Sequence, residues 1–402
     1  MTLPDPSDIR TQWFSLRESG EGLRALDIAR RLGVAEAALV ASACGGAAGP
    51  VRATRLEADV RALFGRLPSL GTVKAITRNA HAVIEVEGTY DNIEFFGTMG
   101  QSVSDIDLRV FSSRWKHLFA VEEETKRGVR KSLQFFDAHG LALHKLYALD
   151  ATDAAAYGAL VGEHAAADQS PGQALEPAPA PAPARPDAEV DVAGLRAAWL
   201  ALKDTHEFHG LLRTFGVART QALRLAGDDL AYRLAPGALE AALHEAVRAE
   251  LPFMIFVGNP GVVQIFSGVV RRVVPTGGWS NVLDPAFNLH VWREGVAEAW
   301  LVRKPTDQGV ITALEFYDAA GEQIALFVGK RKGVQPESPA WRALAEAIEP
   351  AARPSPPRPD PSVSLPCLAD APGRPTSSVA GARNLQVFAS RSPSSRPARG
   401  FG

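Results

Sequence analysis

The chain has 402 residues, which is enough for two or three domains of ordinary size. Its hydrophobic content of 46% is typical of a globular protein, and its 43 basic and 45 acidic residues give a formal net charge of −2. A nucleic-acid-binding protein usually presents a strongly basic face, so the composition gives no electrostatic indication of a nucleic-acid partner.

The two cysteines, Cys44 and Cys367, stand far apart and form no CxxC pair, which is typical of a protein in a reducing compartment. The first residues are polar and lack the apolar segment of a secretory signal. No run approaches the roughly 18 apolar residues that a membrane span needs. We therefore expect a cytoplasmic protein that does not insert into a membrane.

The first block of the chain, residues 8–160, changes its periodicity once. Its opening third repeats apolar residues at helical steps, as at Leu23 and Leu26 and then at Ala37 and Val40, with Leu39 beside them. Short segments rich in β-branched and aromatic residues follow, separated by Gly, Asn, Asp and Pro. These segments are VKAIT, HAVIEV, IDLRVF, HLFAVEE and SLQFFDA. The pattern predicts helices followed by antiparallel strands.

Two stretches are not predicted to contribute to a core. Residues 166–191 alternate Ala and Pro, which favours an extended, semi-rigid linker. Residues 350–402 are rich in Pro, Ser and Arg, and we expect them to be disordered. A second globular block is therefore expected at residues 192–348.

The second block repeats the first. RTQWFSLRE corresponds to RAAWLALKD, and LQFFDAHGLALHKLY corresponds to LEFYDAAGEQIALFV. The spacing from Arg109 to His290 is 181 positions, and the spacing from Gly140 to Gly321 is the same. Such constant spacing indicates a tandem duplication. We predict an α+β protein in which each half has a helical segment followed by a large antiparallel meander sheet.

The sequence contains no phosphate-binding GxxxxGK[ST] loop, no GxSxG nucleophile elbow and no HExxH metalloprotease helix. Its most distinctive local feature is KDTHEFHGLLRTFGVAR, in which His206 and His209 are three residues apart and share a helix face. Three interpretations fit: ordinary helix histidines, a zinc site, or one axial ligand to a haem iron. A turn within FGVAR would bring Arg219 back toward His206.

The first repeat has no histidine at the corresponding position, since THEFH is replaced there by a longer segment, SGEGLRALD. A ligand at His206 would therefore be present in one copy only. A site at the junction of the repeats, with its ligand from one repeat and basic residues from the other, explains this asymmetry.

At this point the chain resembles the HemS/ChuS/HmuS family of bacterial haem-handling proteins, also called haemin-degrading factors. The likeness covers nearly all of residues 8–345. The segments that carry it in the first half are ARRLGVAEAALVA, KAITRNAHAV, EGTYDN and IDLRVFSSRWKHLFAVEE. In the second half they are DTHEFHGLLRTFGVARTQAL, FVGNPGVVQIFSG, WSNVLDPAFNLHV, AWLVRKPTDQGVITALEFYDAAGEQIA and GKRKGVQPESPAW.

The resemblance implies that one haem b lies between two similar α+β halves. His206 matches the proximal iron ligand of the family, and Arg109 matches a distal arginine. Arg219, Lys304 and Arg331 match basic residues that hold the haem propionates or line the pocket. These residue types suit their roles, because a neutral imidazole is a strong axial donor and guanidinium groups pair bidentately with carboxylates.

The chain departs from the family pattern before Arg331, where ALFVGKR lacks the Gln and Tyr that relatives often carry. His209 occurs in only some members and is a second candidate iron ligand. No residue is assigned as catalytic. If the protein is an enzyme, its oxygen chemistry belongs to the bound haem and needs an external electron donor.

Three functions remain as hypotheses. The protein accepts imported haem and degrades it, as a haem oxygenase-like enzyme supplied with haem by an ABC importer and with electrons by a reductase. Alternatively, it is a non-catalytic chaperone that delivers haem to a separate haem oxygenase. A third hypothesis, of a different class, is a cofactor-free interaction scaffold.

Overall fold

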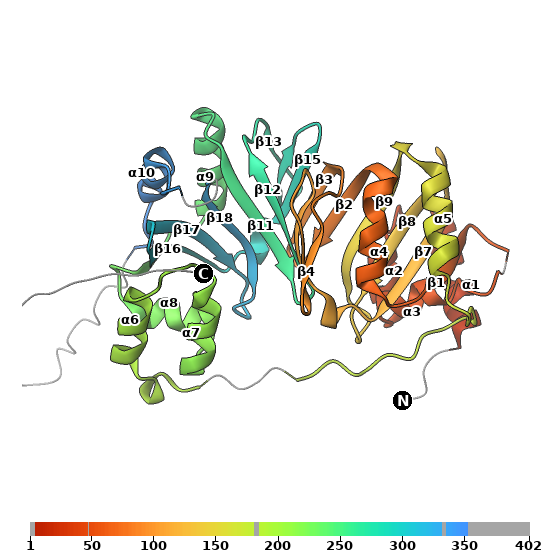
Figure 1. The fold of residues 1–402 in the computed structure, drawn as a ribbon, viewed down its shortest axis with the longest axis horizontal. Helices are drawn as coiled ribbons and strands as arrows, with labels where there is room; N and C mark the ends of the chain where they lie inside the picture. Colours follow the sequence, from red (N-terminus) through yellow and green to blue (C-terminus); the bar gives the residue numbers. More distant parts are fainter. Residues whose placement is uncertain (1–4, 47, 181–184, 332–334, 353–402) are drawn as a thin grey trace, which may run out of the picture. The chain divides into compact units, whose positions relative to one another are not determined.

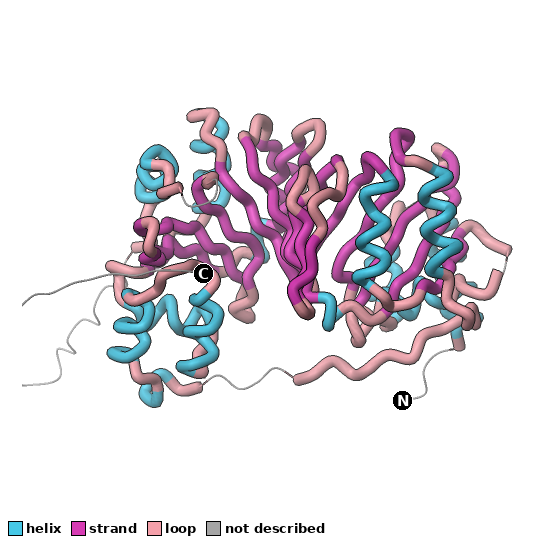
Figure 2. The backbone as a smooth tube through the Cα atoms, in the orientation of Figure 1, coloured by secondary structure: helices cyan, strands magenta, loops and turns pink. Residues whose placement is uncertain are grey.

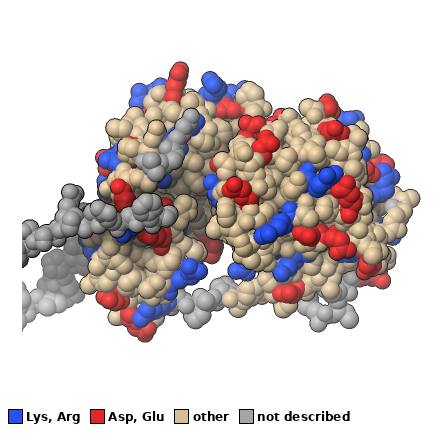
Figure 3. All heavy atoms as spheres, in the orientation of Figure 1, with Lys and Arg blue, Asp and Glu red and all other residues tan. Residues whose placement is uncertain are grey.

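The computed structural model describes residues 5–46, 48–180, 185–331 and 335–352 (Figure 1). The predicted disordered tail lies outside the described residues from position 353 onward, and so does Cys367. Figure 3 shows acidic and basic side chains intermixed over the visible face, in keeping with the small net charge. None of the helices in the described part of the chain combines the length and apolar character required to cross a membrane.

Each repeat begins with three short helices, as the periodicity predicts. In each repeat the second of these helices ends at a glycine, Gly33 in the first repeat and Gly216 in the second. Both glycines take the left-handed conformation that this residue adopts most easily. The first trio is α1 (Pro6–Glu18), α2 (Ala25–Leu32) and α3 (Glu36–Ala41), and the second is α6 (Val192–Leu200), α7 (Glu207–Phe215) and α8 (Arg219–Ala226). The other helices are α4 (Val60–Arg66), α5 (Ala154–His164), α9 (Ala238–Arg248) and α10 (Pro339–Ala347).

The strands form two nine-stranded antiparallel sheets (Figure 2). The first sheet has the order β1 (Val51–Leu56), β7 (His117–Thr125), β8 (Gly128–Phe136), β9 (Ala142–Thr152), β2 (Gly71–Arg78), β3 (Ala82–Gly88), β15 (Phe287–Trp292), β14 (Trp279–Leu283) and β13 (Val273–Thr276). The second sheet has the order β10 (Ala231–Arg233), β16 (Glu298–Thr306), β17 (Gly309–Tyr317), β18 (Gln323–Gly329), β11 (Phe253–Asn259), β12 (Val262–Gly268), β6 (Asp107–Phe111), β5 (Met99–Ser102) and β4 (Glu94–Phe96).

The two repeats exchange three strands each. β4, β5 and β6 of the first repeat complete the second sheet, while β13, β14 and β15 of the second repeat complete the first sheet. The points of exchange are the pairs β12–β6 and β3–β15. The predicted α+β class and tandem duplication are confirmed. The exchange adds to that prediction, because periodicity within a strand carries no information about its neighbour.

The sheets share one apolar core, and each helix trio covers the opposite face of one sheet. The shared core contains Ile84 and Val86 from the first sheet together with Val262 and Ile255 from the second. A separate cluster joins α1–α3 to β7 and β8, and another joins α6–α8 to β16 and β17. The outer face of each sheet is therefore only partly covered by its helices.

Two asparagines, whose positions in the sequence suggest turn residues, also connect the repeats. The Asn79 side-chain amide donates to the carbonyl oxygens of Gly258 and Ile324, at 3.1 and 2.8 Å. The Asn259 amide donates to those of Arg78 and Leu143, at 2.9 and 2.7 Å. These equivalent bonds hold the sheets together where they cross.

The first part of the Ala/Pro-rich segment lies along the first repeat. The Arg55 guanidinium donates to the carbonyl oxygens of Ser170 and Gly172 at 3.0 and 2.6 Å, and the Gln169 side chain bonds to the backbone of Arg55. Leu175 packs against the cluster formed by α1–α3. Backbone and side-chain contacts thus place residues 169–175 against the helical side of the first sheet.

Candidate functional site

His206 stands at the start of α7, on the surface of the second helix trio. Its side chain is 91% exposed, and its Nδ1 lies 2.5 Å from Oδ1 of Asp204. The backbone N–H of His206 donates to the same oxygen at 2.8 Å. Because the carboxylate engages Nδ1, Nε2 is the ring nitrogen available to a ligand. A carboxylate behind the imidazole is the usual way in which proteins orient a metal-binding histidine.

The turn that would return the chain toward His206 is present. α7 ends at Phe215, Gly216 takes φ 60°, and α8 begins at Arg219. His209 is exposed on α7, three residues after His206. In the part of the chain that the structure describes, no three His, Cys, Asp or Glu side chains are grouped as a metal ion would require.

Arg219 and Lys304 meet at a fully buried carboxylate, that of Glu315. Arg219 donates to Glu315 from Nη2 at 2.7 Å and from Nε at 2.8 Å, and Lys304 Nζ donates at 2.8 Å. The Tyr317 hydroxyl also donates to Glu315 and accepts a hydrogen bond from Arg219 Nε at 2.8 Å. We call Arg219, Lys304, Glu315 and Tyr317 the Glu315 cluster.

The aromatic ring of Phe208 covers the two cations of this cluster. The ring centroid lies 5.1 Å from the Arg219 guanidinium carbon and 4.6 Å from Lys304 Nζ. Both distances are within the range of cation–π attraction. Phe208 is two residues from His206, so α7 supplies both the candidate iron ligand and the ring that covers the Glu315 cluster.

Burial and charge act in opposite directions on the ionisation of the cluster. Burial favours a neutral Glu315, but Arg219 and Lys304 outweigh it and hold the pKa of the carboxyl well below its usual range. Burial lowers the pKa of Lys304 to about 8, even though Glu315 opposes this change. The ionised cluster therefore has two cations and one anion at neutral pH, a net charge of +1.

A row of five side chains, apolar in its middle, crosses the second sheet from the Glu315 cluster. Its members pair directly across neighbouring strands and so share one face: Glu315, Leu326, Phe256, Ile265 and Asp107. Four strand spacings separate Glu315 from Asp107, or about 19 Å. We call Leu326, Phe256 and Ile265 the apolar floor. It lies on the face that α6–α8 cover in part.

Arg109 lies on this same face, beyond the far end of the apolar floor. It pairs with Val263 on β12, and its Nη1 donates to the Asp107 carboxylate and to the Leu108 carbonyl oxygen. Its side chain is about one-third exposed. Strand exchange thus brings Arg109, a residue of the first repeat, onto the second sheet, most of whose strands come from the repeat that contains His206.

Arg331 follows β18 and is half-buried. It lies within electrostatic range of Asp204, whose pKa is lowered chiefly by the backbone N–H of His206 and also, to a smaller extent, by Arg331. The structure therefore places Arg331 near the His206 loop and places Arg219 with Lys304. Arg109 is separated from the latter pair by the apolar floor.

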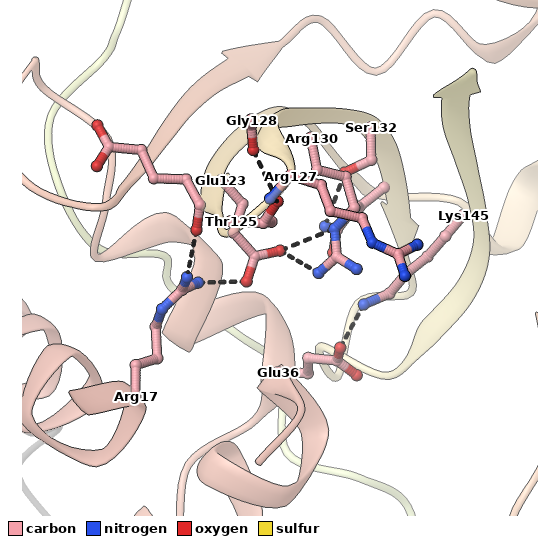
Figure 4. Close-up of polar contacts among 11 residues, drawn as sticks. Arg17, Glu36, Glu123, Thr125, Arg127, Gly128, Arg130, Ser132 and Lys145 are labelled. Carbon is pink, nitrogen blue, oxygen red and sulfur yellow. Dashed lines mark hydrogen bonds and ion pairs between the residues drawn. The ribbon is translucent and has the colours of Figure 1, made fainter. Parts of the chain in front are cut away.

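The equivalent row of the first sheet has different chemistry. It consists of Gln134, Lys145, Ile76, Glu85 and Asn288. There the buried carboxylate comes from a helix: Glu36 of α3 binds Lys145 Nζ at 2.5 Å (Figure 4). Glu36 also pairs with Arg78. Figure 4 also shows Glu123 between Arg17 and Arg130.

Sequence reasoning did not find Glu315, Tyr317 or Phe208. A signal was available in the repeat, because Glu315 and Tyr317 align with Gln134 and Phe136 at the constant spacing of 181. A charged residue that replaces a neutral one at a strand position of a duplicated fold marks a difference between the copies. The partners of that charge come from elsewhere in the chain and are not visible in such an alignment.

The comparisons with known proteins agree with this organisation. The model of the haemin-degrading HemS/ChuX domain matches twice, at residues 33–164 and 216–348. Arg109, Arg219, Lys304 and Arg331 fall within these matches, whereas His206 lies between them.

Similar proteins match most of the chain. The hemin transport protein HmuS of Yersinia pestis is 41% identical over 333 residues, which are 82% of this chain and 94% of that protein. The structure of holo-PhuS, a heme-binding protein of Pseudomonas aeruginosa, matches with a TM-score of 0.83 and 44% identity, covering 86% of this chain and all of that one.

A third relative is described as an enzyme. The structure of ChuS, an Escherichia coli heme oxygenase, matches with a TM-score of 0.76 and 37% identity over 85% of this chain and all of that one. From the two family-model matches and these full-length similarities, we conclude that the chain belongs to the HemS/ChuS/HmuS family.

Proposed function

We propose that this protein binds one haem b between α7 and the uncovered part of the second sheet. The observation that carries the proposal is an apolar floor with cations at both ends on one face of the second sheet, together with an exposed, carboxylate-backed imidazole at the start of α7, which packs on that face. A macrocycle with an apolar ring, a central iron and two carboxylates needs these three kinds of group.

Each residue has a proposed role that follows from its chemistry. His206 is the axial ligand, because its Nε2 is available and its Nδ1 is engaged by Asp204. Arg109 supplies hydrogen-bond donors on the distal side, and Arg219, Lys304 and Arg331 attract the propionates. His209, one helical turn from His206, is the second candidate ligand.

The relatives support a haem-handling function and divide on its chemistry. HmuS is named a hemin transport protein, and ChuS is described as a heme oxygenase. We propose that this protein accepts imported haem from an ABC importer in the cytoplasm and degrades it, or passes it to a separate haem oxygenase. Bound haem would supply oxygen activation if a reductase provides electrons. The residues described here would hold and orient it.

The test of haem binding is a titration of the purified full chain, followed by the Soret absorption of wild type, His206→Ala and His209→Ala. We expect saturation at one haem per chain in wild type and a markedly altered spectrum in His206→Ala. His209→Ala is the matched control, because it removes a neighbouring exposed histidine from the same helix. An unchanged His206→Ala spectrum together with an altered His209→Ala spectrum would make His209 the ligand.

Degradation is tested separately with haem-loaded protein, an electron donor and catalase, which removes free hydrogen peroxide. Loss of the Soret band with a defined tetrapyrrole product supports the enzyme. Stable haem that transfers to an added haem oxygenase supports the chaperone. The absence of any saturable spectrum in wild type would favour the interaction scaffold.

A further inference from the structure

The Glu315 carboxylate is unusually well supplied with donors for a side chain in a protein interior. Its exposed fraction is 0%, and Arg219, Lys304 and Tyr317 all donate to it. Gln323 Nε2 lies 3.3 Å from the same carboxylate. Removing such a group of charges from water costs free energy, and the attraction between the charges has to offset that cost.

The fold does not require this cluster. At the spacing of 181, Glu315, Tyr317 and Lys304 correspond to Gln134, Phe136 and Glu123. In the helices, where Gly33 and Gly216 are the equivalent helix ends, Arg219 corresponds to Glu36. β7 and β8 of the first repeat nevertheless pair as β16 and β17 of the second repeat do. The same strand pairing therefore forms without any member of the cluster.

A buried ion pair adds little stability compared with apolar residues of the same volume. The cluster occurs in the repeat that carries His206, and Phe208, two residues from His206, covers its cations. It also stands at one end of the apolar floor. These three placements indicate that the cluster serves the ligand site.

We propose that Glu315 is a positioning residue for carboxylate recognition: it holds Arg219 and Lys304 beneath Phe208 and balances one of their two charges, so that one net positive charge faces an anionic group of the ligand. The inference rests on the proposed function, with a haem propionate as that group. Without Glu315, the two cations repel each other, and the guanidinium of Arg219 has no carboxylate partner that fixes its orientation.

The experiment compares the affinity of the full chain for haem with its affinity for haem dimethyl ester, which lacks the carboxylate charges. We expect wild type to prefer haem by about tenfold or more, the typical value of a hydrogen bond to a charged group. Glu315→Gln should reduce this preference to less than about threefold. Glu315→Asp, which retains the charge, should keep at least half of the wild-type preference for haem over the ester.

Glu36→Gln is the matched control. Glu36 is a similarly buried carboxylate with one arginine and one lysine partner, but it belongs to α3 and its partners lie on the first sheet. It should lower thermal stability by a similar amount and leave the haem-to-ester preference unchanged. If Glu315→Gln does not fold, Tyr317→Phe removes one donor and copies Phe136, and a two- to threefold loss of preference is expected.

The possible outcomes separate the inference from the proposed function. If wild type binds neither porphyrin saturably, the proposed function fails. If wild type binds both equally, or if folded Glu315→Gln or Tyr317→Phe keeps the full preference for haem, the positioning role of Glu315 is wrong while haem binding stands. A loss of preference in Glu36→Gln equal to that in Glu315→Gln also overturns it, because the effect would then follow stability.

Discussion

The corresponding rows of the two sheets have the same strand order and opposite chemistry. On the second sheet, the positions next to Glu315 are Leu326, Phe256 and Ile265. On the first sheet, the positions next to Gln134 are Lys145, Ile76 and Glu85. The backbone register was thus preserved after duplication, while the polarity of this face changed between the repeats.

This difference supports the proposed site on the second sheet. Lys145 is neutralised by Glu36 on α3, and Glu85 lies 3.6 Å from Lys74, so the first sheet satisfies its own charges. The second sheet leaves Leu326 and Phe256 partly exposed between two charged ends, while Ile265 beside them is buried. A partly exposed apolar surface of this kind is typical of a binding site. Four predictions test this comparison.

The largest effect is expected from unbalancing the Glu315 cluster. Glu315→Gln leaves Arg219 and Lys304 without a counter-ion and should cost about 3–5 kcal/mol of unfolding free energy. The combined variant Arg219→Ala, Lys304→Met, Glu315→Gln and Tyr317→Phe should lose less than half of that, because no buried charge is left unpaired. Urea denaturation followed by circular dichroism measures both. A combined variant less stable than Glu315→Gln would mean that the cluster mainly stabilises the fold.

The next effect concerns the apolar floor. Phe256→Glu should lower haem affinity about 100-fold, since burial of a phenylalanine side chain contributes about 2–3 kcal/mol and each 1.4 kcal/mol is tenfold. Ile76→Glu changes the corresponding position of the first sheet and should leave affinity unchanged. Both are measured by Soret titration after circular dichroism has shown that the variants fold. Equal losses in the two variants would contradict the assignment of the site to the second sheet.

A third difference between the repeats lies in the core. His144 is buried, with Thr77 and Tyr90 as hydrogen-bond partners, whereas the corresponding residue of the second repeat is Ala325. Burial lowers the pKa of His144 to about 3 from its ordinary value of 6.5. Below pH 6.5 the unfolded chain binds a proton that the folded chain does not, so the stability present above pH 6.5 is lost as the pH falls toward 3.

The expected loss is up to about 1.4 kcal/mol per pH unit, or roughly 2 kcal/mol between pH 6.5 and 5. His144→Gln keeps polar groups at this position but does not titrate, so its stability should change less over this range. Urea denaturation at each pH, with each protein referred to its own value at pH 7, measures the difference. Parallel curves for the two proteins would show that His144 is not the titrating group.

The smallest effect is expected at positions where the repeats are equivalent. Asn79→Ala removes three hydrogen bonds to backbone carbonyls of the other repeat, one of them long at 3.4 Å, and Asn259→Ala removes two; each variant should cost about 1–2 kcal/mol. Similar losses, measured by urea denaturation, would confirm that the two connections are equivalent. A much larger loss in one variant would show that the repeats are held together unequally.

Much of the local structure could be predicted from the sequence. The helical steps around Leu26 and Leu39 correspond to α2 and α3, and the turn within FGVAR is formed by Gly216. The positions of Asn79 and Asn259 suggested turns, but their side chains also bond across to the other repeat. Local conformation follows from local sequence, whereas the partner of a side chain depends on the whole chain.

The sequence by itself determined the duplication, the helical opening of each repeat with antiparallel strands after it, and His206 as the distinctive histidine, because periodicity and spacing are local properties. The helices α4, α5, α9 and α10, between and after the strands, were not predicted. Only the tertiary structure decided that Arg109 joins the sheet of the second repeat and that Glu315 gathers Arg219 and Lys304. Strand pairing and the burial of a charge depend on contacts between residues as far apart as Arg219 and Glu315. Such contacts form only when a complete sheet brings those residues together.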